Sequence, residues 1–62
     1  MGTVFVGTYT SEGHDVSFEV YKDDQVEIIE TYNGKPMPSV VVDLSDARAK
    51  QDQLSKLGYQ LV

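Results

Sequence analysis

The chain has 62 residues and a formal net charge of −5, with one histidine and no cysteine. Disulfides are therefore excluded, and a structural zinc site is not expected because such sites are built from cysteine and histidine. An acidic chain repels phosphate backbones, so we expect no direct binding to nucleic acid. No apolar run approaches the ~20 residues that span a bilayer, so no membrane association is expected.

The length indicates one domain, residues 1–62. A chain of this size buries only about 60% of the surface that its unfolded form exposes. Self-association would bury more apolar surface, so a homodimer is one expectation. The N-terminal residues lack the basic region and long apolar run of a secretion signal. Together with the lack of cysteine, this predicts a cytoplasmic protein.

The charge is divided unequally along the chain. Residues 1–34 carry seven acids and one base, a net charge of −6, whereas residues 35–62 carry three acids and four bases, a net charge of +1. Such an acidic first half would attract a basic partner and speed its association.

Residues 3–10 are rich in β-branched and aromatic side chains and predict a first strand. A short turn over residues 11–13 follows. Residues 14–21 then alternate, with Val16, Phe18 and Val20 on one side and polar residues on the other. This alternation is typical of a strand with one buried and one wet face.

Asp23 and Asp24 predict a turn, and residues 25–32 a third strand. Its alternation is mixed, because Ile29 is apolar out of phase and Glu30 is charged in phase. Either a bulge shifts the register near Ile29, or both faces of this strand are partly covered. Asn33-Gly34 is a strong hairpin signal, so the chain should double back there.

Residues 36–42 allow two interpretations. Pro36 and Pro38 lack amide donors and confine this stretch to an edge or a loop. Three valines at 40–42 favour a short fourth strand, and the alternative is a helix that starts soon after Pro38 with Ser39 as its cap.

A helix is predicted over residues 46–57, with Ser45 as N-cap. Asp46–Lys50 and Asp52–Lys56 are acid-before-base pairs at i,i+4 spacing. The expected apolar stripe is interrupted by Gln51 and consists of Leu44, Ala47, Leu54 and Leu57. Gly58 suits a Schellman C-terminus in which Tyr59 closes over Leu54. Residues 59–62 then form a last strand or fill the core.

These elements predict an α+β fold: an antiparallel β-meander of three to four strands with one C-terminal α-helix packed on one face. The helix should cover the face of Val16, Phe18 and Val20. The opposite face of the sheet would be left open.

No catalytic, cofactor or metal motif is recognisable. His14 is interpreted as a solvated side chain near a turn. Glu19 and Glu27 are expected to face each other across neighbouring strands, but on an open face both remain in water, which is unfavourable for acid–base catalysis. Asp23-Asp24 with Glu27 lacks the spacing and the glycine of a calcium loop. We therefore predict no enzyme, no cofactor and no metal ligand.

Four of the six aromatic residues are tyrosines. Tyr21 lies in phase with the polar side of the second strand, where Ile29 and either Phe5 or Tyr9 could join it. An aromatic patch ringed by carboxylates is typical of binding surfaces. The alternative is cross-strand packing that shields a small sheet.

Three segments follow one another along the chain. They are an acidic hairpin with Val16-Ser17-Phe18-Glu19-Val20-Tyr21, then Tyr32-Asn33-Gly34, then Pro38-Ser39-Val40-Val41-Val42 before a short polar helix. In this order the chain resembles the small acidic proteins that phages use against host defences, including anti-CRISPR inhibitors. The resemblance implies a nucleic-acid mimic in the host cytoplasm that occludes a basic nucleic-acid-binding surface of a host protein with carboxylates. The predicted partner-binding residues, with the apolar patch included, are Asp15, Glu19, Tyr21, Asp23, Asp24, Glu27, Ile29 and Glu30.

Two functional hypotheses follow from the sequence. The first is a non-enzymatic acidic module that binds a basic protein surface. The alternative is a small structural protein that self-associates through its exposed sheet face.

Overall fold

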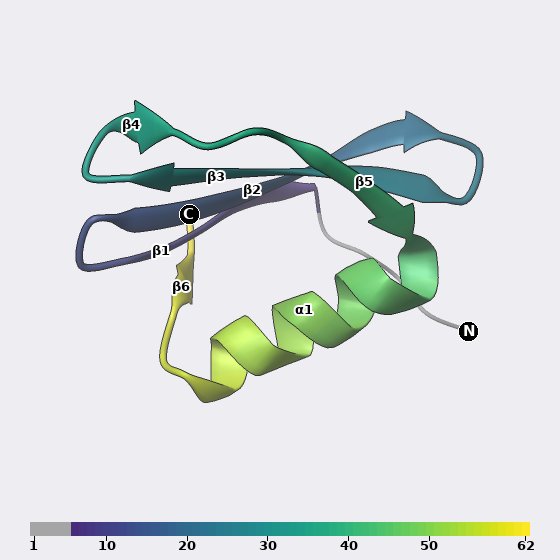
Figure 1. Ribbon diagram of the computed structural model, residues 1–62. Coiled ribbons are helices and arrows are strands. Elements are labelled where there is room, and N and C mark those ends of the chain that lie inside the picture. Colours follow the sequence, from purple (N-terminus) through teal and green to yellow (C-terminus); the bar gives the residue numbers. More distant parts are fainter. Residues whose placement is uncertain (1–5) are drawn as a thin grey trace.

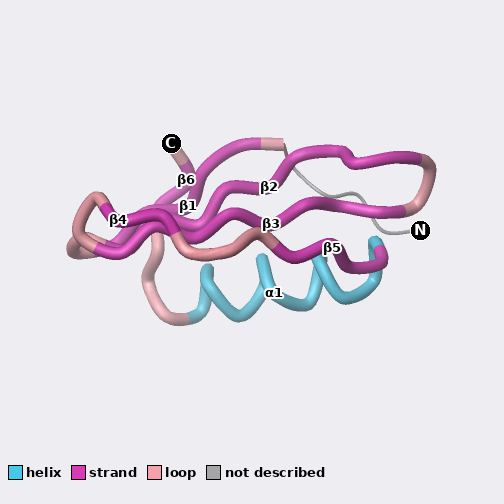
Figure 2. The backbone as a smooth tube through the Cα atoms, turned by 45° about the horizontal axis from the view of Figure 1, so that its top comes forward, coloured by secondary structure: helices cyan, strands magenta, loops and turns pink. Residues whose placement is uncertain are grey.

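The computed structural model describes residues 6–62 as a sheet with a helix across one of its faces (Figures 1 and 2). The helix α1 spans Leu44–Lys56. The strands are β1 Gly7–Ser11, β2 His14–Lys22, β3 Gln25–Tyr32, β4 Lys35–Pro36, β5 Val40–Asp43 and β6 Gln60–Leu61. The predicted α+β class, with an antiparallel sheet and one packed helix, is confirmed. In the described part of the chain, no helix is long and apolar enough to cross a membrane.

All strand pairs are antiparallel, in the order β4-β3-β2-β1-β6. Strand β5 also pairs with β3, on the side of β4 but farther along the strand. The first three strands form the predicted meander, although residues 3–5 of the predicted first strand lie outside the described residues. Helix α1 then carries the chain beneath the sheet from β5 to β6, at the opposite edge (Figure 1).

The register of β2 and β3 depends on a bulge between Val20 and Lys22. Beyond the bulge, Phe18 pairs with Ile28 and Val20 with Val26, so apolar residues share one face. If the pairing of β2 with β3 slipped by one residue, the apolar side chains of one strand would turn to the opposite face of the sheet. The sequence allows a bulge near Ile29 as one of two alternatives. That alternative is wrong, because the irregularity lies at the end of β2, between Val20 and Lys22.

The two turns at the other end of the meander lie side by side. Asn33 and Gly34 have φ of 51° and 84°, as the predicted Asn-Gly hairpin requires. The amide of Asn33 donates to the Gly13 carbonyl at 2.6 Å. A side chain on Gly13 would meet the Asn33 amide group. Glycine is therefore required at position 13 both for its φ of 83° and for space.

Residues 40–42 are a strand, not the start of a helix. Val40 to Asp43 pair with Ile28 to Gln25 of β3, which suits β-branched side chains. The helix begins at Leu44, two residues before the predicted start, and its N-cap is Asp43 rather than Ser45. The amide of Leu44 donates to the Asp24 carbonyl at 2.9 Å. This bond ties the first turn of the helix to the β2–β3 hairpin.

The helix ends in the predicted Schellman arrangement. Gly58 has φ of 93°, its amide donates to the Ser55 carbonyl at 3.1 Å, and the Tyr59 amide donates to the Leu54 carbonyl at 3.0 Å. The chain then returns as β6, whose Leu61 pairs with Tyr9 of β1. Of the two expectations for residues 59–62, the last strand is therefore correct.

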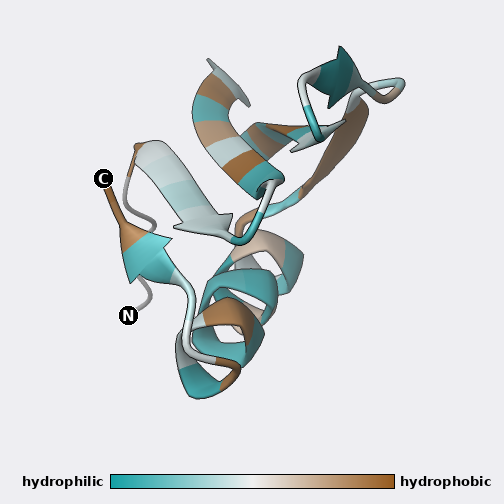
Figure 3. Cartoon of the chain, turned by 90° about the vertical axis from the view of Figure 1, so that its left-hand side faces the viewer, coloured by the Kyte–Doolittle hydropathy of each residue, from teal (hydrophilic) through white to brown (hydrophobic). Residues whose placement is uncertain are grey.

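The core lies between the helix and one face of the sheet. Apolar and polar residues alternate along the long strands, seen as brown and teal bands in Figure 3. Its buried apolar side chains are Tyr9, Val16, Phe18, Val26, Ile28, Ala47 and Leu54. Two predictions for this core are wrong. Val20 is exposed because the pairing of β1 with β2 ends at Gly7 and Phe18, so no strand within residues 6–62 flanks β2 on that side at Val20. Leu57 is 66% exposed because it is the C-cap, whereas Gln51 is buried in the stripe.

Candidate protein-binding face

Within residues 6–62, no helix or strand covers the face of the sheet opposite α1 (Figures 1 and 2). The strand register shows which residues lie on it. Cross-strand neighbours share a face, and the face alternates along each strand. The first row across the sheet is Thr8, Ser17 and Ile29, and the next toward the hairpin tip is Glu19, Glu27 and Val41. We call this surface the open face. It contains hydroxyl, carboxylate and apolar side chains.

Glu19 and Glu27 are direct cross-strand partners, as predicted. Val41 of β5 extends their row to the edge of the sheet. Within residues 6–62, the ion pairs both involve Glu30, so neither of these two carboxylates has a basic partner there. Like charges placed directly opposite one another destabilise a sheet. This row therefore carries a local electrostatic cost, and Lys22, the cross-strand partner of Gln25 in the next row, is the nearest base of the sheet on this face.

The other predicted carboxylates divide between different places. Asp23 and Asp24 are exposed in the β2–β3 turn, at the end of the open face. Asp15 is half-buried on the open face and accepts a hydrogen bond from the Thr10 hydroxyl. Glu30 lies on the helix face, because it is the cross-strand partner of the buried Val16. The register thus separates Glu30 from the open-face group.

The predicted aromatic patch forms only in part. Tyr21 is exposed at the bulge and Ile29 is half-buried on the open face. Tyr9 is instead buried on the helix face, where its ring meets Phe18 edge-on at 5.7 Å. It therefore cannot contribute to the open face, and Phe5 lies outside the described residues.

His14 is not the solvated side chain that the sequence predicts. Its side chain is 17% exposed and both ring nitrogens have partners. Nε2 lies 2.8 Å from Glu30 Oε1, and Nδ1 lies 2.6 Å from the Tyr59 hydroxyl. The ring also stacks on Tyr32, with centroids 4.2 Å apart. In the neutral ring, Nε2–H donates to the carboxylate and Nδ1 accepts from the Tyr59 O–H.

The partners of His14 set the electrostatics of this cluster. Burial alone would raise the pKa of the Glu30 carboxyl. Hydrogen bonds from His14 and Tyr32, together with the nearby Lys50 ammonium, outweigh burial and lower that pKa below its ordinary value. Desolvation and the Glu30 carboxylate raise the pKa of the Tyr32 phenol. The cluster joins β2, β3 and the segment after α1.

Sequence reasoning missed this cluster, although one signal was present. Glu30 is a charge in phase with the apolar residues of β3. Burying a charged residue costs free energy unless the charge is paired. His14 lies at the end of β2 that pairs with the end of β3 where Glu30 is found. Because both ring nitrogens are occupied, the arrangement fastens the C-terminal segment to the sheet.

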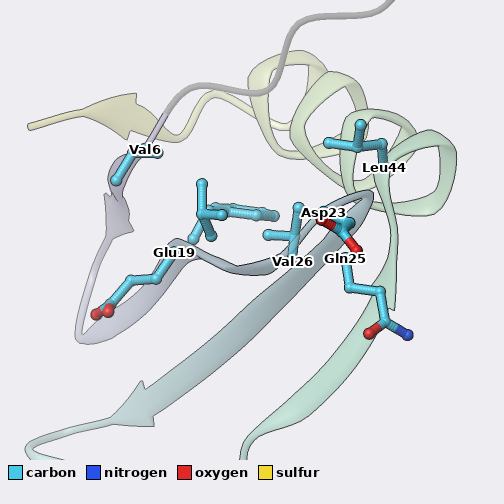
Figure 4. Close-up of a pocket in the computed structure, with 8 residues that line it drawn as sticks. Val6, Glu19, Asp23, Gln25, Val26 and Leu44 are labelled. Carbon is cyan, nitrogen blue, oxygen red and sulfur yellow. The ribbon is translucent and has the colours of Figure 1, made fainter.

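A small apolar cavity of about 50 Å³ lies beneath the hairpin tip, on the helix side (Figure 4). Ligand pockets usually measure about 300–1,000 Å³, so this space is too small for a cofactor. It is lined by Val6, Phe18, Glu19, Val20, Asp23, Gln25, Val26 and Leu44. Among the residues placed by the structure, no three His, Asp or Glu side chains are grouped to hold a metal ion.

No family model matches this chain, and neither a curated protein nor a solved structure shows significant similarity to it.

Proposed function

We propose that this protein is a non-enzymatic binding module that presents the carboxylates of its open face to a basic surface of another protein. The observation that carries the proposal is the cross-strand pair Glu19–Glu27, which has no basic partner within residues 6–62. A cationic partner would relieve the repulsion between these carboxylates and add attraction of its own. The binding surface then extends along the hairpin to Tyr21, Asp23 and Asp24.

Asp15 and Ile29 form the more distant part of this surface. Glu30 is not included, because its carboxylate is bound by His14 on the helix face. In its sharpest form, the proposal is an inhibitor of the phage anti-defence type, acting in the host cytoplasm. It would occlude the nucleic-acid-binding surface of a host protein, since Lys and Arg side chains form charge-assisted hydrogen bonds with carboxylates as well as with phosphates.

The test is affinity capture from bacterial lysate at low and high salt, with three forms of the tagged protein. The wild type should retain a basic protein, and the Glu19→Lys/Glu27→Lys variant should lose it. The control, Glu12→Lys/Asp52→Lys, makes the same change of net charge at exposed residues away from the open face and should behave like the wild type. Equal retention by all three forms, or equal loss from both variants, would contradict the proposal.

A second candidate function is self-assembly through the open face. The exposed apolar side chains of Tyr21 and Val41 on or beside this face favour it. Light scattering on the purified protein distinguishes the two. A monomer at high micromolar concentration argues against assembly. A dimer that survives Glu19→Lys/Glu27→Lys but dissociates on Tyr21→Ser/Val41→Ser argues for it.

A further inference from the structure

Strand β5 has one paired edge and one free edge. It pairs with β3, and no other strand in the described part of the chain lies against it. The Leu44 amide donates to the Asp24 carbonyl, and these two residues continue the β3–β5 register. Hydrogen-bonded pairs alternate along an antiparallel ladder. Val42 and Val40 therefore bond to β3, whereas Val41 directs its N–H and C=O outward and Asp43 directs its N–H outward. The Asp43 carbonyl belongs to the helix, because Asp43 is the N-cap of α1.

The side chains along this edge differ between the two faces. Val41 and Asp43 lie on the open face, next to Glu27 and Gln25 respectively. Val40 lies on the helix side, and Val40 and Val41 are 50% and 40% exposed. The edge thus offers the N–H and C=O of Val41, the N–H of Asp43, and apolar contact on the helix side. On the open face it offers the carboxylates of Asp43 and Glu27, neither of which forms an ion pair within residues 6–62. Strand β5 itself contains no basic residue.

We infer that the free edge of β5 binds an extended segment of a basic partner protein as an added strand. The segment alternates basic side chains over the open face with apolar side chains over Val40 and Val42. This inference rests on the proposed function and specifies how the partner is held. Strand addition supplies affinity through main-chain hydrogen bonds and specificity through alternate side chains.

The spacing of the sheet allows the basic side chains to reach the carboxylates. Neighbouring strands lie about 4.8 Å apart, so Glu27 is only two strands away from the added segment. Asp43 is on the adjacent strand. A lysine or arginine beside Val41 can therefore approach both carboxylates from above the open face.

Charge argues against a second copy of the chain as the occupant. Pairing β5 with itself would bring a second Asp43 and a second Glu27 toward the first pair, with no base from β5 to offset them. The chain as a whole carries −5. Like-charge juxtaposition costs binding free energy, whereas a basic segment gains it.

The test is an NMR titration of the ¹⁵N-labelled protein with the blocked peptide Lys-Val-Lys-Val-Lys-Val. Two control peptides are Lys-Lys-Lys-Val-Val-Val, of identical composition, and Glu-Val-Glu-Val-Glu-Val. The alternating basic peptide should bind roughly tenfold more tightly than either control. The main-chain hydrogen bonds are the same for all three peptides, but only the alternating one places all its lysines over the open face, and the glutamate peptide is repelled there. It should also slow hydrogen exchange at the Val41 and Asp43 amides.

The matched variant is Val41→Pro. Proline removes the outward N–H at position 41 but no hydrogen bond to β3, and edge strands tolerate it on their solvent side. This variant should lose about tenfold in peptide affinity. Its ¹⁵N spectrum, compared with the wild type, shows whether the β3–β5 pairing persists, and the exchange measurement on the wild type tests the inference independently.

The outcomes separate the inference from the proposed function. If Val41→Pro binds the peptide as the wild type does, and Val41 and Asp43 gain no protection, the edge inference is overturned while the acidic open face stands. If Glu19→Lys/Glu27→Lys also binds unchanged, the proposed function fails with it. Equal binding of the glutamate peptide overturns the charge requirement. A dimer with both amides protected before peptide is added identifies a second copy as the occupant and overturns the inference.

Discussion

The His14 ring uses both nitrogens to join three segments, so each partner atom contributes to stability. Tyr59→Phe removes the hydroxyl that lies 2.6 Å from Nδ1 and leaves that nitrogen without its partner in a half-buried site. We expect a loss of about 1–2 kcal/mol in the free energy of unfolding. Urea denaturation measures it.

The matched control for this prediction is Tyr21→Phe, because Tyr21 is exposed and its hydroxyl has no partner within residues 6–62. That substitution should change stability by no more than about 0.5 kcal/mol. Equal losses from both variants would show that the hydroxyl of Tyr59 does not support the cluster.

Glu30 makes the stability of this cluster depend on pH. Hydrogen bonds and a nearby ammonium hold the pKa of Glu30 in the folded state below its ordinary value of 4.5. A carboxyl whose folded pKa is lowered contributes stability above its unfolded pKa, and this contribution is lost as the pH falls through the folded pKa. We therefore expect the stability difference between wild type and Glu30→Gln to shrink below about pH 4.5.

Urea denaturation of both proteins from pH 7 down to the acid limit of folding measures that difference. The control is Glu12→Gln, which replaces an exposed carboxylate in the β1–β2 turn. A wild type that remains equally superior to Glu30→Gln at every pH would contradict the role assigned to the carboxylate.

At the scale of the elements, the helix is held to the sheet by few apolar side chains, of which Leu54 is the largest that is buried. Leu54→Ala should lower the free energy of unfolding by about 2–5 kcal/mol, since it opens a cavity against the core. Leu57→Ala changes the same side chain one turn later, where it is exposed, and should cost no more than about 0.5 kcal/mol. Thermal unfolding followed by circular dichroism compares the two variants.

Element boundaries were predictable where a local signal decides them. Asn33-Gly34 and Gly58 require positive φ, and both the hairpin and the helix C-terminus lie where the sequence predicts them. The helix N-terminus was not predictable in this way. Its position depends on the bond from the Leu44 amide to the Asp24 carbonyl, which joins residues that only the β3–β5 pairing brings together.

In the candidate site, the face of each residue within a strand was predictable, but the pairing between strands was not. Alternation alone places Glu19 and Tyr21 on the polar side of β2. Whether Glu19 meets Glu27 depends on the bulge between Val20 and Lys22, because a tight turn at Asp23-Asp24 without a bulge would pair Val20 with Glu27 instead. The removal of Glu30 from the group depends on the same register.

Across the whole molecule, fold stability and partner binding make opposite demands on the open face. The chain carries −5, and Glu19 faces Glu27 without an ion pair to either carboxylate within residues 6–62. Glu27→Gln keeps the shape of the side chain and removes one of the two charges. We expect it to stabilise the isolated protein by about 0.2–1 kcal/mol at low ionic strength.

This gain should fade as salt is raised, because exposed charges are screened over about 8 Å at physiological ionic strength. Urea denaturation in low and high salt measures it, with Asp52→Gln on the exposed side of the helix as the control. The same Glu27→Gln substitution should weaken capture of a basic partner. A variant that is destabilised, or whose gain does not depend on salt, would show that the two carboxylates do not repel each other, and the main argument for a cationic partner at this face would be lost.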